Sequence, residues 1–521
     1  MLWPAVDIER SRNVRFISLA PNITETVAYF DGLDKLAAVT NDCDYPAAAK
    51  NKPRVGKYTY PDLEKIIALQ PAVVLLESSA DPRFKSKLRD LRIDYREYDF
   101  TSLRNYFAEL KRLSADLDLA ADAKIAELNK LWREKFPALR KKTAIVVWQN
   151  PPIAAGRDTF LADYFASLGC QNIISRTARY PELSLEQLYQ ADIIVNLSGQ
   201  PWRLTNGQPV VEPAADLYLR LSPRLLQARG EMQRLLAAAS GDWSADRRAA
   251  ALRGYRALRL VMALLVGGGL ALSGLLYQAM LSNPLAEPYL LGVSSGAAVG
   301  ALGGLLFNCP PFFTAVLGAL LALALVYLLA RKQGKLENNG LILSGVMLNA
   351  FCGALIMLSV FFAGDKVNSL MFWLMGDLGT SVWPQAWLSG AVLLAVALFA
   401  VWQSGRIELL SMGDEQAESL GVEVNRLKTF LLVLISALTA VIVASVGIIG
   451  FVGLIIPHLV KMLCGERLGL NIFLTLLGGA LFLALSDLAA RTILPEIILP
   501  VGIITALLGV PFFALVYKRT V

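Results

Sequence analysis

The sequence predicts a soluble α/β part followed by an all-α membrane part. Over the first half, short apolar segments of strand length alternate with amphipathic helical segments, which is typical of βαβ units on a parallel sheet. From Arg256 onward charged residues become sparse and long apolar runs follow one another. About 20 apolar residues in a helix are enough to cross the hydrocarbon core of a bilayer. The length of 521 residues also favours more than one domain.

The first half predicts two small α/β lobes. The stretch from Ser102 to about Lys135 is amphipathic and contains no Gly or Pro, so we expect one rigid helix there, between the lobes. In chain order the pattern predicts a strand at 15–20, a helix at 24–31, an apolar segment at 36–40, a helix at 62–69 and strands at 72–77, 144–148 and 191–197, with helices at 158–168 and 183–188 between the last two. The expected parts are an N-terminal extension (1–13), a first lobe (about 14–101), a bridging helix (about 102–135) and a second lobe (about 140–237), followed by a polar linker (238–255) and a membrane part (256–521).

Composition excludes several classes of function. The net charge of +7 comes from basic residues interleaved with acidic ones along predicted helices, which indicates solvated faces rather than a nucleic-acid site. The five cysteines show no metal-ligand spacing, and His458 is the only histidine, so we expect no metal site. We find neither a phosphate-binding GxxxxGK[ST] loop nor a catalytic motif, and no secretory signal pattern in the first 13 residues.

The second half predicts nine membrane crossings. Basic clusters stand at alternate ends of the apolar runs, and positive charge marks the cytoplasmic side. The C-terminus is then expected inside and the α/β part outside. The clusters are Arg331, Lys332 and Lys335; Arg406; Arg426 and Lys428; Lys461 and Arg467; and Lys518 and Arg519. The apolar runs lie at about 257–280, 289–308, 311–330, 339–363, 383–404, 429–446, 449–464, 471–490 and 499–517.

Three segments of the first half carry a family resemblance. VGKYTYPDLEKIIALQPAVVLLE, NDCDYP (41–46) and SLEQLYQADIIVNL resemble the helix-bridged (class III) substrate-binding proteins of cobalamin, haem and siderophore importers. The stretch SLAPNITETVAYFDGLDKLAAVTNDCDYP is most similar to the cobalamin-binding branch. The resemblance implies a ligand held between the lobes against aromatic rings, and Tyr58, Tyr60 and Trp148 are the candidates. Each of these rings is also a candidate for ordinary packing.

Three motifs of the second half resemble the permease subunits of cobalamin and iron–siderophore ABC importers. They are SNPLAEPYLLGVSSGA (282–297), MGDEQAESLGV (412–422) and GFVGLIIPH (450–458). The family's permease has ten helices with both ends cytoplasmic, whereas here its first helix is replaced by the polar linker. The loss of one crossing would turn the N-terminus outward, as an N-terminal binding domain requires.

The same resemblance implies roles for individual residues. The second motif is expected to dock a cytoplasmic ATPase, and an amphipathic interfacial turn is its alternative. The residues of this coupling segment are Gly413, Asp414, Glu415, Glu418, Leu420 and Gly421. Asn283 and Leu285 match positions near the family's cytoplasmic gate. An acidic residue on each lobe, Glu64 and Glu186, is expected to meet arginines on the outer face of the permease, namely Arg256, Arg259 and Arg491.

The resemblance therefore implies a fused binding protein and permease of a type II ABC importer. We expect a homodimer in the bacterial inner membrane, with no cofactor of its own and with ATP used by a separate cytoplasmic ATPase dimer. The expected ligand is cobalamin or a related corrinoid, and haem or an iron–siderophore is the alternative. A ligand-sensing membrane receptor is the alternative of another class, against which the ATPase-docking motif argues.

Overall fold

The computed structural model describes residues 16–149, 151–174, 179–202, 207–239, 244–307, 309–332, 334–362, 367–465, 467–493 and 499–520. The predicted N-terminal extension lies outside these ranges. The chain divides into two compact units, Met1–Ala249 and Ala250–Val521. The first is the α/β part and the second is the helical part, so the predicted fold class is confirmed at this level, and each unit is described separately.

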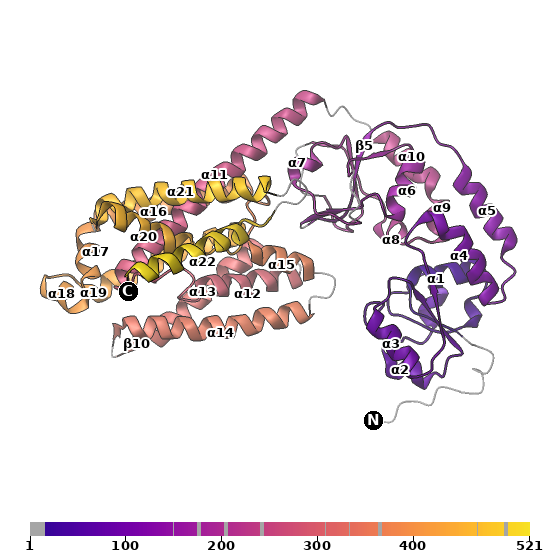
Figure 1. Ribbon diagram of the computed structural model, residues 1–521, viewed down its shortest axis with the longest axis horizontal. Helices are drawn as coiled ribbons and strands as arrows, with labels where there is room; N and C mark the ends of the chain where they lie inside the picture. Colours follow the sequence, from indigo (N-terminus) through magenta and orange to yellow (C-terminus); the bar gives the residue numbers. More distant parts are fainter. Residues whose placement is uncertain are drawn as a thin grey trace. The chain divides into compact units, whose positions relative to one another are not determined.

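The first lobe is a parallel four-stranded sheet in the order β2-β1-β3-β4, with apolar cores on both faces. Helices surround this sheet (Figure 1). Successive strand residues face opposite sides: Leu75 packs with α1 and α4, while Val74 and Leu76 pack with α2 and α3. Burial on both faces explains the continuous apolar strands. The elements are β1 (Phe16–Ser18), α1 (Pro21–Tyr29), β2 (Leu36–Val39), α2 (Leu63–Ala68), β3 (Val73–Glu77), α3 (Pro82–Asp90) and β4 (Tyr95–Tyr98), with 3₁₀ turns at Leu33–Lys35 and Ala47–Asn51.

The second lobe repeats this layering on a sheet in the order β6-β5-β8-β9, with β7 beside β5. Its strands are parallel except for β6, which turns back antiparallel along β5. One apolar core runs from α1 of the first lobe, through α4 (Leu103–Asp116), into α6 and β8 of the second lobe. The elements are β5 (Lys142–Gln149), β6 (Pro152–Ala154), α6 (Phe160–Ser167), β7 (Gln171–Asn172), α7 (Leu185–Leu188), β8 (Ile193–Asn196), β9 (Val210–Val211), α8 (Ala215–Tyr218), α9 (Pro223–Gln227) and α10 (Arg229–Ala238).

The bridge between the lobes is two helices, so the prediction of a single rigid helix over 102–135 was wrong. α4 (Leu103–Asp116) ends in a turn, and α5 (Asp122–Arg133) begins after it. Asp118 adopts a left-handed conformation with φ of 50°, which Asp tolerates better than most non-glycine residues. The Ser114 hydroxyl donates to the Leu119 carbonyl at 2.7 Å and closes the turn. The absence of Gly and Pro therefore did not guarantee a continuous helix.

The predicted polar linker is helical in its second half. α11 (Ala245–Met280) is 36 residues long and begins eleven residues before the predicted start of the membrane part. Ser244 accepts a hydrogen bond from the Arg247 backbone N–H at 3.4 Å, in the manner of an N-cap. The Ala-, Leu- and Arg-rich sequence that follows has high helix propensity. At about 1.5 Å per residue α11 is about 54 Å long, well beyond the roughly 30 Å hydrocarbon core.

The second unit contains six described helices that are long and apolar enough to cross a membrane, namely α11, α13, α14, α16, α19 and α21. Three shorter apolar helices, α12, α20 and the described part of α22, coincide with the other predicted runs. Nine crossings therefore stay a prediction. The remaining bounds are α12 (Val293–Leu306), α13 (Pro311–Ala330), β10 (Arg331–Lys332), β11 (Lys335–Leu336), α14 (Asn338–Phe362), α15 (Val367–Met375), α16 (Trp383–Trp402), α17 (Ser404–Ser411), α18 (Asp414–Ser419), α19 (Val424–Val446), α20 (Val452–Cys464), α21 (Leu468–Thr492) and α22 (Val501–Thr520).

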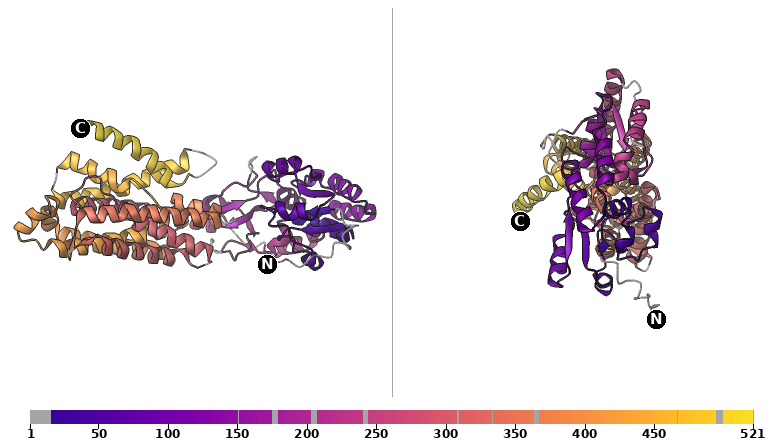
Figure 2. Two further views of the ribbon diagram at one scale, coloured as in Figure 1. Left: turned by 90° about the horizontal axis from the view of Figure 1, so that it is seen from below. Right: turned by 90° about the vertical axis from the view of Figure 1, so that its right-hand side faces the viewer.

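The long helices of this unit run side by side (Figure 2). Glycines let three of them, α11, α20 and α21, approach closely. A Cβ atom on Gly267 of α11 would lie 2.2 Å from the Gly479 carbonyl oxygen of α21, and the reverse distance is 2.3 Å. A Cβ atom on Gly274 of α11 would come even closer to the Gly453 carbonyl oxygen of α20. Small residues at helix contacts are the usual basis of packing inside membranes, where apolar attraction between helices is weak.

Polar contacts define two ends of the second unit. At the α18 end, Ser282 after α11 donates to the Leu410 carbonyl of α17 at 3.1 Å. Asn338 of α14 donates to the Leu281 carbonyl at 3.3 Å. The Arg259 end contains Tyr255, Arg259, Asp377, Asp487 and Arg491. Arg259 precedes Met280 by 21 residues of α11, so the two ends are about 30 Å apart.

Candidate functional site

A cavity of about 550 Å³ lies at the carboxyl end of β3 in the first lobe. Glu77, the last residue of β3, lines this cavity, and ligands of open parallel sheets bind at such strand ends. The predicted residues Tyr58 and Tyr60 line the same cavity from the loop before α2, and Phe84 of α3 adds a third ring. The structure therefore brings two of the three predicted aromatic residues together.

Tyr58 is fixed by two carboxylates. Its hydroxyl donates to Glu77 Oε2 at 2.6 Å, and its backbone N–H donates to Asp42 Oδ2 at 2.6 Å. Asn22 donates to the other oxygen of Glu77. Burial, and next to it the negative charge of Glu77, raise the pKa of Tyr58 far above its usual value, so the phenol keeps its proton. Tyr60, in contrast, is 80% exposed and stands at the rim.

Trp148 lies in the other lobe. It is a half-buried residue of β5 that pairs with Ile153 of β6, and it does not line the cavity of the first lobe. Tyr180 of the second lobe is a further exposed ring, and it does not line this cavity either. Partial burial raises the pKa of its phenol, and the charge of Arg179 opposes that shift.

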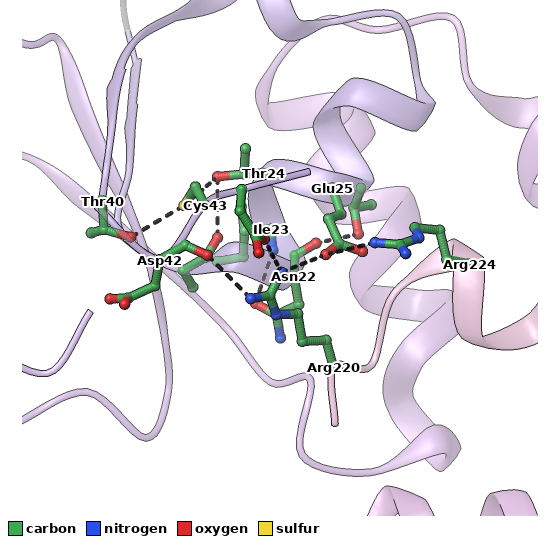
Figure 3. A network of polar contacts seen from close by, with 12 residues as sticks. Asn22, Ile23, Thr24, Glu25, Thr40, Asp42, Cys43, Arg220 and Arg224 are labelled. Carbon is green, nitrogen blue, oxygen red and sulfur yellow. Dashed lines mark hydrogen bonds and ion pairs between the residues drawn. The ribbon is translucent and has the colours of Figure 1, made fainter. Parts of the chain in front are cut away.

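The NDCDYP segment ties the two lobes together (Figure 3). Arg220, after α8, donates to Glu25 of α1 at 3.0 Å and to Asp44 at 2.5 Å. Burial alone would raise the pKa of Asp44, but the hydrogen bond from Arg220 holds it below its ordinary value. Arg224 of α9 lies 3.5 Å from the buried Glu25 carboxylate and over the Tyr45 ring at 3.6 Å. These contacts hold the end of the α/β unit against the first lobe.

The two predicted docking glutamates both stand in the first turn of a short helix. Glu64 is exposed in α2, whose N-cap Asp62 accepts a hydrogen bond from the Lys65 N–H at 3.2 Å. Glu186 is partly exposed in α7, which begins with a capping box between Ser184 and Gln187. Acidic residues favour the first turn of a helix for electrostatic reasons, independently of any docking role.

Arg259 is an internal residue, which corrects the expectation that its guanidinium is presented on the outer face. Its side chain is 4% exposed, and it donates to both oxygens of Asp487 on α21 at distances of 2.8 to 3.1 Å. The Tyr255 hydroxyl accepts from Arg259 at 2.8 Å. Arg491 shares Asp487 at 3.2 Å and remains partly exposed. Arg256 is exposed, so it fits the predicted docking position better than Arg259 does.

The predicted coupling segment forms a short helix at the α18 end. Glycines with positive φ flank it, at 118° for Gly413 and 84° for Gly421. Glu415, Glu418 and Leu420 are exposed. Asp414 instead faces inward, where Lys428 of α19 donates to its carboxylate at 2.5 Å. The segment thus presents Glu415 and Glu418 to solvent and is attached to α19 through Asp414.

The predicted gate residues lie in the turn between α11 and α12, also at the α18 end. Asn283 Oδ1 accepts the Leu285 backbone N–H at 2.9 Å, which fixes the turn, and the Leu285 side chain is half-exposed. Over the described ranges, no group of three or more His, Cys, Asp or Glu side chains is arranged to hold a metal ion.

The chain thus combines an α/β unit that contains a cavity with a helical unit that has several helices long and apolar enough to cross a membrane. The sequence matches the FecCD transport family over residues 222–519 and a periplasmic binding protein family over 17–200. The chain belongs to the FecCD transport family and carries a periplasmic binding protein domain at its N-terminus. The matched families and relatives are permease and binding proteins rather than enzymes.

Individual relatives match the permease part. The vitamin B12 import system permease protein BtuC of Citrobacter koseri is 38% identical over 287 residues, which cover 53% of this chain and 85% of that protein. The hemin transport system permease protein HmuU of Yersinia pestis is 36% identical over 266 residues, covering 49% and 79%. A solved inward-facing structure of a metal-chelate type ABC transporter is 37% identical and covers 50% of this chain and 86% of that one, with a TM-score of 0.48.

Proposed function

We propose that this chain is the binding and translocating subunit of a type II ABC importer that captures cobalamin or a related corrinoid. In this proposal two copies form the membrane pathway, and a separate cytoplasmic ATPase dimer engages α18. The observation that carries it is the presence, in one chain, of an aromatic ligand cavity and of a short exposed helix at one end of a FecCD-type bundle. A ligand-sensing receptor would need the first feature but not the second.

The arrangement of basic residues supports an orientation with the α18 end in the cytoplasm. The β10–β11 hairpin, which carries Arg331, Lys332 and Lys335, contacts Asn425 of α19. Lys461 of α20 donates to Gln278 near the same end of α11 at 3.3 Å. Clusters that are separate in sequence therefore gather at one end, and positive charge favours the cytoplasmic side. The α/β domain is then outside the cell membrane.

Two native cysteines can test this orientation. Cys309, between α12 and α13, and Cys464, at the end of α20, are exposed, whereas Cys43, Cys170 and Cys352 are buried. We expect a membrane-impermeant maleimide to label Cys309 in intact cells and Cys464 only after permeabilisation. Cys309→Ser and Cys464→Ser variants identify the labelled position. Labelling of Cys464 in intact cells, with Cys309 protected, would reverse the proposed orientation.

Tyr58 supports a corrinoid over haem. Haem iron takes its axial ligand from His, Met, Cys or Tyr. The α/β part contains no histidine, its cysteines and Met232 are buried, and the Tyr58 proton is held against Glu77. A corrinoid brings its own cobalt ligands and needs a flat apolar surface with polar contacts at its edge. Among the described tyrosines, the exposed Tyr60 at the cavity rim and Tyr180 of the second lobe are residues that would favour the haem alternative.

Ligand identity can be measured by absorbance titration of the purified chain with cobalamin and, separately, with haem. We expect cobalamin to bind, Tyr58→Ala to weaken binding about tenfold through loss of ring contact, and Tyr58→Phe to keep most of it. Haem binding with a ligated-iron spectrum that Tyr60→Phe abolishes would instead establish the haem alternative. Tyr95→Phe, at a half-buried ring that does not itself line the cavity, is the matched control.

A further inference from the structure

The helix α18 is too small to hold its position by itself. It has six residues, and Ala417 is the only one whose side chain is buried. Isolated helices shorter than about 12 residues are marginal in water because nucleation is unfavourable. The flanking Gly413 and Gly421 have positive φ, and no atom lies within 4 Å of where their Cβ atoms would be. Apart from the packing of Ala417 in the core of the unit, α18 therefore needs a further contact to pass a push on to the membrane helices.

Lys428 provides that contact. Its side chain is 0% exposed, in the second turn of α19. The ammonium donates to Asp414 of α18 at 2.5 Å and to Asn338 of α14 at 2.6 Å. One buried cation therefore connects α18 with the first turn of α14 and the second turn of α19. A buried ammonium requires such partners, since an unpaired charge there would be strongly unfavourable.

We propose that Lys428 is the positioning residue that transmits displacement of α18 to α19 and α14. This inference rests on the proposed function, in which the ATPase engages α18. The bond is directional and short, and α19 is packed within the bundle along most of its length. The exposed residues Glu415 and Glu418 would receive the ATPase, while Asp414 and Lys428 would carry the motion inward.

An exposed ion pair on the same helix serves as the comparison. Lys335 of the β10–β11 hairpin contacts Glu418 at 3.2 Å, with side chains 70% and 47% exposed. Solvent screens such a pair, and its contribution is small. Lys335→Met and Lys428→Met remove the same group from two partners of α18, so they differ mainly in burial.

The test uses the full chain in vesicles with its ATPase. We expect Lys428→Met to lower ligand-stimulated ATP hydrolysis and transport about tenfold or more, with ligand binding by the α/β part close to that of the unaltered chain. Cleavage at Glu415 and Glu418 by a glutamate-specific protease should become faster, because α18 loses its attachment. Lys335→Met should change ATP hydrolysis, transport and the rate of protease cleavage by less than about twofold each.

Two further variants keep the inference falsifiable. If Lys428→Met is poorly folded, the double variant Lys428→Met and Asp414→Asn removes the charge that is left unpaired. We expect the double variant to fold, and its transport to be as poorly coupled to ATP hydrolysis as that of either single variant. Normal transport and normal protease resistance in the double variant would overturn the proposal. Glu415→Lys tests the ATPase-docking assignment separately. It should lower ligand-stimulated ATP hydrolysis without faster protease cleavage of α18. Unaltered ATP hydrolysis in this variant would refute the docking role of α18, whereas the cleavage result for Lys428→Met would still test the attachment of α18.

Discussion

Asp487→Asn is expected to destabilise the membrane unit more than any other conservative substitution proposed for this chain. Asp487 is the shared acceptor of Arg259 and Arg491, and its side chain and that of Arg259 are both 4% exposed. Removal of one partner from a buried ion pair typically costs about 3–5 kcal/mol, because the other charge stays buried without compensation. The loss should appear as a lower midpoint of thermal unfolding in detergent and as reduced membrane yield.

Asp377→Asn is the matched control for this prediction. Asp377 approaches the same guanidinium at 3.9 Å, but its side chain is 38% exposed. The same chemical change should therefore cost no more than about 1 kcal/mol. Arg259→Leu combined with Asp487→Leu should recover part of the loss, since a buried pair replaced by apolar residues is often tolerated. Equal stability of the Asp487 and Asp377 variants would show that the pair does not hold α11 against α21.

The sequence predicted the alternation of elements well because burial on both faces of a parallel sheet leaves a clear signal. Strands at 72–77 and 191–197 were expected where β3 and β8 lie, and the apolar runs coincide with helices. The break at Asp118 was missed because it depends on one left-handed residue and one side-chain hydrogen bond. The helical first turns of α11 were missed because their polar composition was interpreted as a linker.

The candidate site was predicted only in part, for a different physical reason. Aromatic residues on a loop could be selected as ligand contacts, but the partner of Tyr58 could not. A signal was present: β3 of the first sheet and β5 and β8 of the second end in the polar residues Glu77, Gln149 and Asn196, and the carboxyl ends of strands are where open parallel sheets bind ligands. Whether an arginine is exposed cannot be derived from its place in a sequence motif, as Arg259 shows. That property depends on an acid 228 residues away.

The position of Arg259 changes how docking between the domains should be tested. Reversal of Arg259 would leave Asp487 facing a second carboxylate, so any loss of transport would mix folding with docking. Reversal of Arg491 has the same defect, because Arg491 also contacts Asp487 at 3.2 Å. The exposed Arg256 is the better permease partner for a charge-reversal experiment on Glu64 and Glu186.

We expect Glu64→Arg or Glu186→Arg to reduce transport about tenfold or more, because like charges brought together at an interface cost several kcal/mol. Alanine variants at Glu64 or Glu186 should transport nearly normally, since an exposed ion pair contributes only about 0–1 kcal/mol. The covalent link also keeps the effective concentration of the binding domain high, about millimolar for short flexible linkers. Arg256→Glu should restore part of the activity of at least one reversed glutamate. Transport in vesicles, with ligand binding measured in parallel, separates docking from capture.

Glu231→Arg is the control that matches the local cost of this substitution. Glu231 is exposed and stands in the first turn of α10, and no docking role is predicted for it. An arginine at this position interacts unfavourably with the helix N-terminus, at a cost of about 0.3–1 kcal/mol, as it would at Glu64 or Glu186. Transport by this variant should stay near that of the unaltered chain. The defect of the docking variants should also diminish at high salt, because solvated charges are screened beyond about 8–10 Å. If Glu64→Arg and Glu186→Arg both transport like Glu231→Arg, the two glutamates serve only their own helices, and the domains must meet through other residues.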